Sequence, residues 1–224
     1  MTAPDHPDLS VDQQHAMRTA ATRLASEFQG LFGVETIDRF LTSSYDQFAG
    51  RATIPNYLPL LAERFARQRL HALAKVEGKS HDGRPVVLFL CVHNAGRSQM
   101  ALGFLQHHAG ESVVGWSGGS QPGNAVEAGA VIVMAERGID IAREYPKPWT
   151  DEIVRAADVV ITMGCGDACP IFPGKRYLDW ALEDPAGKGV ESVRPIRDEI
   201  EQRIRALIAE LSVPAPPGRS PHRG

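Results

Sequence analysis

Cysteine is scarce in this chain, which has only three among 224 residues: Cys91, Cys165 and Cys169. So small and odd a number argues against a structural disulfide framework, and it cannot complete a four-cysteine zinc site. Unreactive thiols, part of a metal site and redox chemistry all stay open at this point. The residues around each cysteine distinguish among these three alternatives.

Long apolar runs and a charge excess are also missing. No segment approaches the roughly 20 apolar residues that a transmembrane helix requires. The opening residues, MTAPDHPDLS, have neither a basic start nor an apolar core. We therefore expect no signal peptide, no membrane partner and a cytoplasmic location. A net charge of -3 gives no sign of a nucleic-acid partner.

Residues 1–75 carry three stretches of apolar residues at helical spacing. The first stretch begins after a capping box formed by Ser10 and Gln13, and Gly33 is expected to end it. Three amphipathic helices with short connections predict a small three-helix bundle. Residues 76–85 are polar and contain glycine and proline, which predicts a linker.

From residue 86 onward, short β-rich runs alternate with helical patterns. The predicted strands cover residues 86–90, 112–116, 158–163 and about 176–180. The predicted helices cover residues 98–109, 124–137 (capped by Asn124 and Glu127), 150–157 and 193–211. This alternation predicts an α/β domain over residues 86–211, with a parallel sheet covered by helices. Residues 212–224 are rich in proline and are predicted to be a disordered tail.

The most informative segment, CVHNAGRS, lies directly between a predicted buried strand and the start of a helix. At the carboxyl end of a parallel strand, backbone N–H groups and the helix N-terminus can bind a tetrahedral oxyanion. Arg97 can reach back over the loop and hold two oxyanion oxygens, and Gly96 permits backbone angles that a β-carbon opposes. We therefore predict a substrate-binding loop made of Val92, His93, Asn94, Ala95, Gly96, Arg97 and Ser98.

The same electrostatic field acts on Cys91. A thiol at a helix N-terminus beside an arginine favours the thiolate form, Ser98 can donate its hydroxyl to the sulfur, and Asn94 can hold the loop. One arrangement would thus supply both the anion site and the nucleophile. Residues 117–123, SGGSQPG, are expected to support this loop or to form a plain turn. The alternative for Cys91 is a buried cysteine at a strand end, followed by an ordinary helix cap.

CVHNAGRSQMA after VVLFL resembles the low-molecular-weight tyrosine phosphatase fold family, and the QMA is similar to its arsenate reductase branch. The resemblance covers residues 86–211 and implies a four-stranded parallel sheet with helices on both faces. The family keeps its general acid in an Asp-Pro loop, so the resemblance assigns this role to Asp184, which precedes Pro185. A surface turn is the alternative. Phosphatases of the family usually have an aromatic residue next, whereas Ala186-Gly187 suits a small inorganic substrate better.

Cys165 and Cys169 follow the third predicted strand, in TMGCGDACP. Their spacing allows a disulfide within a helix or within a flexible loop. The resemblance to three-cysteine, thioredoxin-coupled arsenate reductases implies that Cys91 attacks arsenate, that Cys165 then attacks Cys91, and that Cys169 releases Cys91 by attacking Cys165. A low-molecular-weight thiol of the mycothiol type is the alternative reductant to thioredoxin. A metal clip or two unreactive thiols are the alternatives to the relay.

The resemblance also bears on cofactors and partners. Some family members bind potassium through an acidic residue just after the methionine and alanine of the loop, but Leu102 stands there, although Asn94 and Ser117 are kept. We therefore expect no bound potassium, no metal and no resident cofactor. Phosphate and sulfate, which are also tetrahedral oxyanions, are expected to compete with arsenate. The N-terminal helices resemble an extension of actinobacterial reductases, and we expect them to serve homodimer formation or docking.

Two other functions stay open. The chain could be a low-molecular-weight protein tyrosine phosphatase of the same fold, acting on phosphotyrosine or small phosphate esters. It could also be a redox-sensing regulator that binds DNA through residues 1–75, although that segment has no cysteine and no concentrated positive charge. We predict reduction of arsenate to arsenite, with Cys91, Arg97, Asp184, Cys165 and Cys169 as the catalytic residues.

Overall fold

The computed structural model describes residues 9–50, 57–80, 82–164 and 171–211. The chain divides into two compact units, of which one comprises Met1–Asp82 with Thr150–Ala156 and the other comprises Gly83–Trp149 with Ala157–Gly224. The short segment at residues 150–156 thus belongs to the helical unit, although it lies far along the chain. None of the helices in the described ranges is long and apolar enough to cross a membrane.

The helical unit consists of α1 (Val11–Glu27), α2 (Val34–Ala49), α3 (Leu58–Val76) and α6 (Asp151–Ala156). The predicted capping box is present at α1, where Ser10 and Gln13 each accept a hydrogen bond from the other's backbone N–H, at 3.2 and 3.0 Å. The predicted stop at Gly33 is wrong, because α1 ends at Glu27 and Gly33 is the N-cap of α2. The left-handed glycine that follows α1 is Gly30, with φ +80°.

Three arginines of the helical unit, Arg23, Arg67 and Arg69, are paired with acidic residues. Glu63 of α3 is almost fully buried, and it accepts hydrogen bonds from both Arg23 and Arg67. Because these two guanidinium groups outweigh its desolvation by burial, the pKa of Glu63 lies below its ordinary value. Arg69 donates to Glu152 of α6 at 2.6 Å. These pairs join α1, α3 and α6 into one unit.

The second unit contains β1 (Val86–Cys91), α4 (Arg97–Ala109), β2 (Val114–Gly119), α5 (Ala128–Ala135), β3 (Val159–Met163), β4 (Arg176–Asp179) and α7 (Val190–Glu210). Its sheet has the order β2-β1-β3-β4, and every neighbouring pair is parallel. The predicted four-stranded parallel sheet is confirmed. In the register of the sheet, Cys91 pairs with Gly119 on one side and Met163 on the other, so Cys91 lies at the carboxyl end of a central strand.

Two predicted details of this unit are wrong. Strand β2 begins at Val114 rather than at residue 112, because Gly110–Ser112 form a 3-10 turn. Asn124 and Glu127 do not form a side-chain cap for α5, which begins at Ala128 without one. The backbone N–H of Glu127 instead donates to the carbonyl oxygen of Ala95 at 2.9 Å, so this segment is tied to the Cys91 loop.

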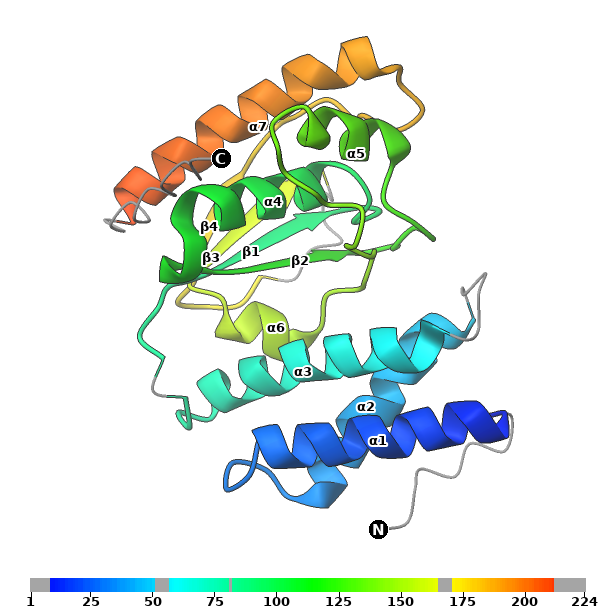
Figure 1. Ribbon diagram of the computed structural model, residues 1–224. Coiled ribbons are helices and arrows are strands. Elements are labelled where there is room, and N and C mark those ends of the chain that lie inside the picture. Colours follow the sequence, from blue (N-terminus) through cyan, green and yellow to red (C-terminus); the bar gives the residue numbers. More distant parts are fainter. Residues whose placement is uncertain (1–8, 51–56, 81, 165–170, 212–224) are drawn as a thin grey trace, which may run out of the picture. The chain divides into compact units, whose positions relative to one another are not determined.

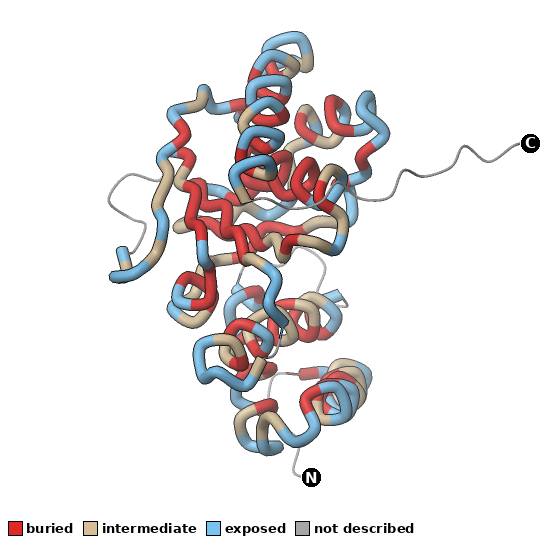
Figure 2. The backbone as a smooth tube through the Cα atoms, turned by 90° about the vertical axis from the view of Figure 1, so that its left-hand side faces the viewer, coloured by how far each residue is buried: buried red, intermediate tan, exposed pale blue. Residues whose placement is uncertain are grey.

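The core of the second unit lies between the sheet and a layer of helices. Helices α4, α5 and α7 pack together on one face of the sheet (Figure 1). Strand β1 is buried at every position, and Figure 2 shows burial concentrated along the strands and on the inward sides of the helices. Fully buried side chains such as Phe89, Met100 and Phe104 fill this layer. The strand and helix that flank the Cys91 loop are therefore held firmly.

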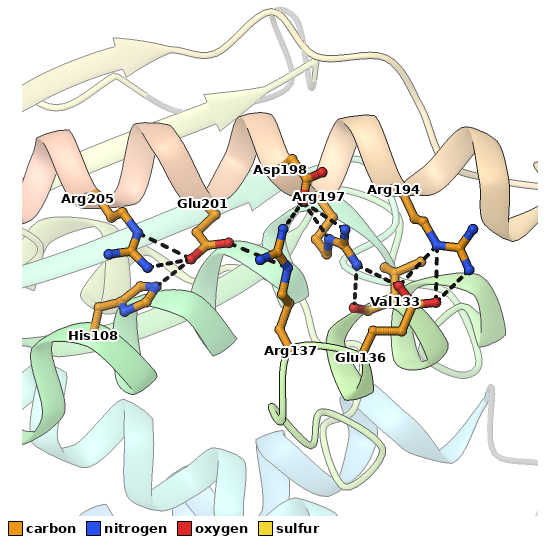
Figure 3. Close-up of polar contacts among 9 residues, drawn as sticks. All are labelled: His108, Val133, Glu136, Arg137, Arg194, Arg197, Asp198, Glu201 and Arg205. Carbon is orange, nitrogen blue, oxygen red and sulfur yellow. Dashed lines mark hydrogen bonds and ion pairs between the residues drawn. The ribbon is translucent and has the colours of Figure 1, made fainter. Parts of the chain in front are cut away.

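Helix α7 is fastened to its neighbours by a row of ion pairs (Figure 3). Glu136 accepts hydrogen bonds from Arg194 and Arg197, and Glu201 accepts them from Arg205 and His108. The hydrogen bond from Arg194 is the main cause that lowers the pKa of Glu136 to about 2. Burial acts to raise the pKa of Glu201, but Arg205, Arg137 and His108 together outweigh it and the pKa is lowered overall.

These ion pairs predict an acid-sensitive fold. A carboxyl group whose pKa is lowered on folding stabilises the protein above its unfolded pKa, and this stabilisation is lost as the pH falls through the folded value. For Glu136 the interval runs from 4.5 down to about 2. We expect the wild-type free energy of unfolding to fall steeply in this interval and Glu136→Gln to flatten the fall, as measured by urea unfolding at a series of pH values. Glu111→Gln, at an exposed residue of the same unit, is the control. An unchanged slope in Glu136→Gln would contradict this account.

Candidate functional site

The sulfur of Cys91 is surrounded by hydrogen-bond donors. The side chain is buried, and its Sγ accepts the backbone N–H of Asn94 at 3.2 Å. Ser98 Oγ lies 3.0 Å from the same sulfur and also accepts a hydrogen bond from Asn94 Nδ2 at 2.8 Å. With the Asn94 amide donating to it, the Ser98 hydroxyl can direct its own hydrogen to the sulfur. This arrangement favours a sulfur that carries negative charge.

Asn94 holds the loop in an unusual conformation. It is the one non-glycine residue with a positive φ, 47°, among those that the structure describes, and asparagine tolerates this region better than most residues. Its Oδ1 accepts hydrogen bonds from the Lys147 backbone N–H at 3.0 Å and from Gln99 Nε2 at 3.2 Å. Because Oδ1 faces these two donors, Nδ2 is fixed toward Ser98.

The carbonyl oxygens of the loop point toward residues 120–127. Four carbonyl groups accept backbone N–H bonds from this segment, at 3.3, 2.9, 2.8 and 2.9 Å, and they belong to Cys91, Val92, His93 and Ala95. In a trans peptide the next N–H points away from the carbonyl oxygen. The N–H groups of residues 92, 93, 94 and 96 therefore point to the other side of the loop. Loop geometry of this kind suits a tetrahedral oxyanion.

Arg97 and Asp184 meet across the site. Arg97 Nη2 donates to Asp184 Oδ2 at 2.9 Å, and Nη1 donates to the carbonyl oxygen of Leu182 at 3.2 Å. The arginine side chain is 8% exposed, whereas that of Asp184 is 50% exposed and can exchange protons with solvent. A β-carbon on Gly96 would lie 2.7 Å from Pro185 Cγ, so the Asp-Pro loop packs directly against the Cys91 loop. The fold thus brings together the two segments that the sequence singled out.

The remaining predicted site residues fall into two groups. His93 is exposed at the loop, with Nδ1 3.1 Å from the carbonyl oxygen of Gln121. Cys165 and Cys169 lie outside the described residues. Gly164, which directly precedes Cys165, has φ +74°, and a β-carbon there would lie 3.0 Å from Arg97 Nη1. Strand β3 therefore brings the chain to Arg97 immediately before Cys165.

Lys147 is a residue of this region that the sequence did not single out. It is 3% exposed, and its Nζ donates to Ser117 Oγ at 3.3 Å and to the Tyr145 carbonyl oxygen at 3.4 Å. Lysine is almost never fully buried unless it is paired, so this burial calls for a reason. The flanking residues Pro146 and Pro148 were the only available signal, because they restrict the backbone on both sides.

The residues present do not fit a potassium ion. Leu102, at the position where some family members carry an acidic residue, is buried among apolar side chains and offers no oxygen. Ser117 Oγ and the Tyr145 carbonyl oxygen accept hydrogen bonds from an ammonium group. A hard cation requires oxygen ligands, and here an ammonium group already engages two of the nearby oxygens. In the described parts of the chain, no group of histidine, cysteine, aspartate and glutamate could hold a metal ion.

Comparison with known families gives two matches along the chain. Residues 86–214 match the family described as low molecular weight phosphotyrosine protein phosphatase. Residues 17–74 match the protein-tyrosine-phosphatase-like N-terminal domain. The first match covers the strands, the Cys91 loop and the Asp-Pro loop.

Individual relatives give the same picture. The structure of a thioredoxin-dependent arsenate reductase of Corynebacterium glutamicum is 47% identical, covers 88% of this chain and 97% of its own, and has a TM-score of 0.80. An arsenate reductase of Halalkalibacterium halodurans is 36% identical over 55% of this chain and 95% of its own length. A glutaredoxin arsenate reductase of Synechocystis is 35% identical over 56% of this chain and 98% of its own length. The chain therefore belongs to the low molecular weight phosphotyrosine protein phosphatase family.

Proposed function

We propose that this chain is an arsenate reductase, which converts arsenate to arsenite with Cys91 as the nucleophile and thioredoxin as the reductant. The proposal is carried by the Cys91 sulfur, which faces Asn94 and Ser98 in a loop suited to an oxyanion, in a chain similar to named arsenate reductases. We place the reaction in the cytoplasm, where thiols are kept reduced.

The first step is formation of a sulfur–arsenic bond. Arsenate binds to the N–H groups of the loop and to the Arg97 guanidinium, which can hold two oxygens at once. The Cys91 thiolate attacks arsenic, and Asp184 gives a proton to the departing oxygen, which leaves as water. Arg97 must exchange its hydrogen bond with Asp184 for the oxyanion, and this exchange leaves the carboxyl group available for proton transfer. Phosphate and sulfate compete for the same groups.

The second step reduces arsenic. The thiolate of Cys165 attacks the sulfur of Cys91, a disulfide forms, and the electron pair of the sulfur–arsenic bond leaves with arsenic as arsenite. Cys169 then attacks Cys165 and releases the Cys91 thiolate, and a thioredoxin dithiol reduces the remaining disulfide. Gly164 lies against Arg97 and is covalently joined to Cys165, which supports a short path between Cys165 and Cys91.

A coupled assay separates this function from a phosphatase of the same fold. We expect arsenate-dependent oxidation of NADPH in the presence of thioredoxin and its reductase. Cys165→Ser is expected to abolish multiple turnover with arsenate, because no thiol then attacks Cys91, and to leave slow hydrolysis of a small aryl phosphate unchanged. Arsenate turnover that survives Cys165→Ser would contradict the relay. Hydrolysis of the phosphate ester without any arsenate turnover in the wild type would favour the phosphatase.

The same assay distinguishes the electron donors. Thioredoxin with its reductase is compared with glutaredoxin and with a mycothiol-type system at equal reductase activity. We expect the thioredoxin arm to give the fastest NADPH oxidation. A rate that depends on the low-molecular-weight thiol alone would reassign the donor and keep the chemistry at Cys91.

We also propose that the helical unit serves homodimer formation rather than DNA binding. Arg23, Arg67 and Arg69 are paired with acidic residues, so they do not form a concentrated basic surface. Sedimentation of the full chain at several concentrations should reveal a dimer, and a monomer at every concentration would contradict this role. A gel shift with the chain's own promoter DNA at physiological salt should be negative.

A further inference from the structure

Lys147 is a buried cation that the proposed mechanism does not use. Its side chain is 3% exposed and belongs to the segment at residues 145–149, which runs beside the end of β2. The backbone fixes this segment on both sides of the lysine, because Gly119 N–H donates to the Lys147 carbonyl oxygen at 2.9 Å and Trp149 N–H donates to Gly119 at 3.4 Å. Pro146 and Pro148 restrict it further. These backbone contacts and the two prolines hold Lys147 in a fixed position.

The same lysine is coupled to the nucleophile through Asn94. The Lys147 backbone N–H donates to Asn94 Oδ1 at 3.0 Å, and the amide nitrogen of Asn94 donates to Ser98. Ser98 Oγ in turn lies 3.0 Å from the Cys91 sulfur. Every link in this chain of hydrogen bonds is buried, and electrostatic effects are strong in such an environment.

We propose that Lys147 is a positioning residue, whose backbone N–H orients the Asn94 amide and whose fixed ammonium charge stabilises the Cys91 thiolate. This inference deepens the proposed function, since it names what holds the nucleophile charged. The proposal also gives a role to the lysine beside Ser117, in a region whose residues do not form a suitable set of ligands for a potassium ion.

Other titratable groups of these loops must be taken into account. Arg97 at the start of α4 donates to Asp184 of the Asp-Pro loop, and Nδ1 of His93 in the Cys91 loop lies near the Gln121 carbonyl oxygen. Glu144 lies near the lysine, with Oε2 3.9 Å from Lys147 Nζ, and it is 23% exposed. All of these groups are kept when only Lys147 is changed, so a comparison with the wild type isolates the contribution of the lysine side chain.

The test follows the rate of Cys91 alkylation by iodoacetamide as a function of pH. The full-length, prereduced chain is used without arsenate, and mass spectrometry of the peptide that contains Cys91 gives the rate. We expect Lys147→Met and Lys147→Gln to move the midpoint to higher pH by about one unit, the order expected for one buried charge nearby. Lys147→Arg keeps the charge and should keep the midpoint. Lys79→Met, at an exposed lysine of the helical unit, is the control.

A second variant leaves the lysine intact. Glu144→Gln removes the acidic neighbour of Lys147, so the midpoint should move in the opposite direction, to lower pH. The proposal is overturned if folded Lys147→Met or Lys147→Gln retains the wild-type midpoint, or if Glu144→Gln does not lower it. Because alkylation needs no arsenate, these outcomes are independent of the proposed reaction. A shifted midpoint in a chain without arsenate turnover would refute the reductase and leave the role of Lys147 standing.

Discussion

Replacing Cys91 by serine is expected to reduce arsenate turnover by about 10⁴-fold or more, the scale seen when a nucleophile is removed from an enzyme. A serine hydroxyl is a weak nucleophile at neutral pH. More important, oxygen cannot take part in the disulfide exchange that transfers two electrons to arsenic. The measurement is the initial rate of arsenate-dependent NADPH oxidation with thioredoxin and its reductase in excess.

The variant should lose its chemistry without losing its fold. Serine is only slightly smaller than cysteine, and the site is already lined by the polar groups of Asn94 and Ser98. We expect thermal unfolding close to that of the wild type and continued stabilisation by millimolar phosphate, since the loop N–H groups and Arg97 remain. Turnover in Cys91→Ser above a few per cent of the wild-type rate would show that another group is the nucleophile.

Replacing Arg97 by lysine is expected to lower kcat/KM for arsenate by about 100-fold, although the positive charge is kept. The planar guanidinium can hold two oxyanion oxygens in parallel, whereas an ammonium is a point charge that cannot reproduce this geometry. Arg97 also donates to Asp184 and to the Leu182 carbonyl oxygen, and a lysine ammonium group cannot donate to both acceptors from the same position. Steady-state rates over a range of arsenate concentrations measure the effect, and phosphate inhibition should weaken in parallel.

Arg205→Lys provides the matched control. Arg205 lies on α7, is 61% exposed and pairs with Glu201, so its replacement should leave kcat/KM within about twofold of the wild type. If Arg97→Lys also stays within this range, the guanidinium does not bind the substrate. If only phosphate inhibition changes, Arg97 binds anions but does not act in the reaction with arsenate.

Local sequence patterns were sufficient to predict the centre of the site. The apolar run before the loop forms strand β1, which ends at Cys91, one residue beyond its predicted end. The helix after the loop begins at Arg97 instead of residue 98. Strand, loop and helix here are consecutive in the chain, so their order alone determines where the thiol and the helix N-terminus meet. The Asp-Pro loop was different, because the assignment of Asp184 came from family resemblance and its contact with Arg97 joins residues far apart in the sequence.

The missed features depend on contacts that no local pattern records. Asn124 and Glu127 are residue types that often cap helices, but the backbone N–H of Glu127 donates to the carbonyl oxygen of Ala95. Lys147 sits between two prolines, which is typical of an exposed loop, but it is buried, and its hydrogen bonds with Asn94 and Ser117 join residues far apart in the sequence. The structural role of such polar residues can be predicted correctly only when their tertiary contacts are known.

A single-turnover experiment counts the electrons that the cysteines supply to arsenate, because no external reductant is present. Prereduced, desalted full-length chain is mixed with excess arsenate, and arsenite and free thiols are measured. We expect one arsenite per chain and the loss of two thiols, with a disulfide between cysteine peptides in mass spectrometry. Neither product is expected in Cys91→Ser. Arsenite formed without loss of thiols, or thiol loss without arsenite, would contradict reduction by a cysteine relay that begins at Cys91.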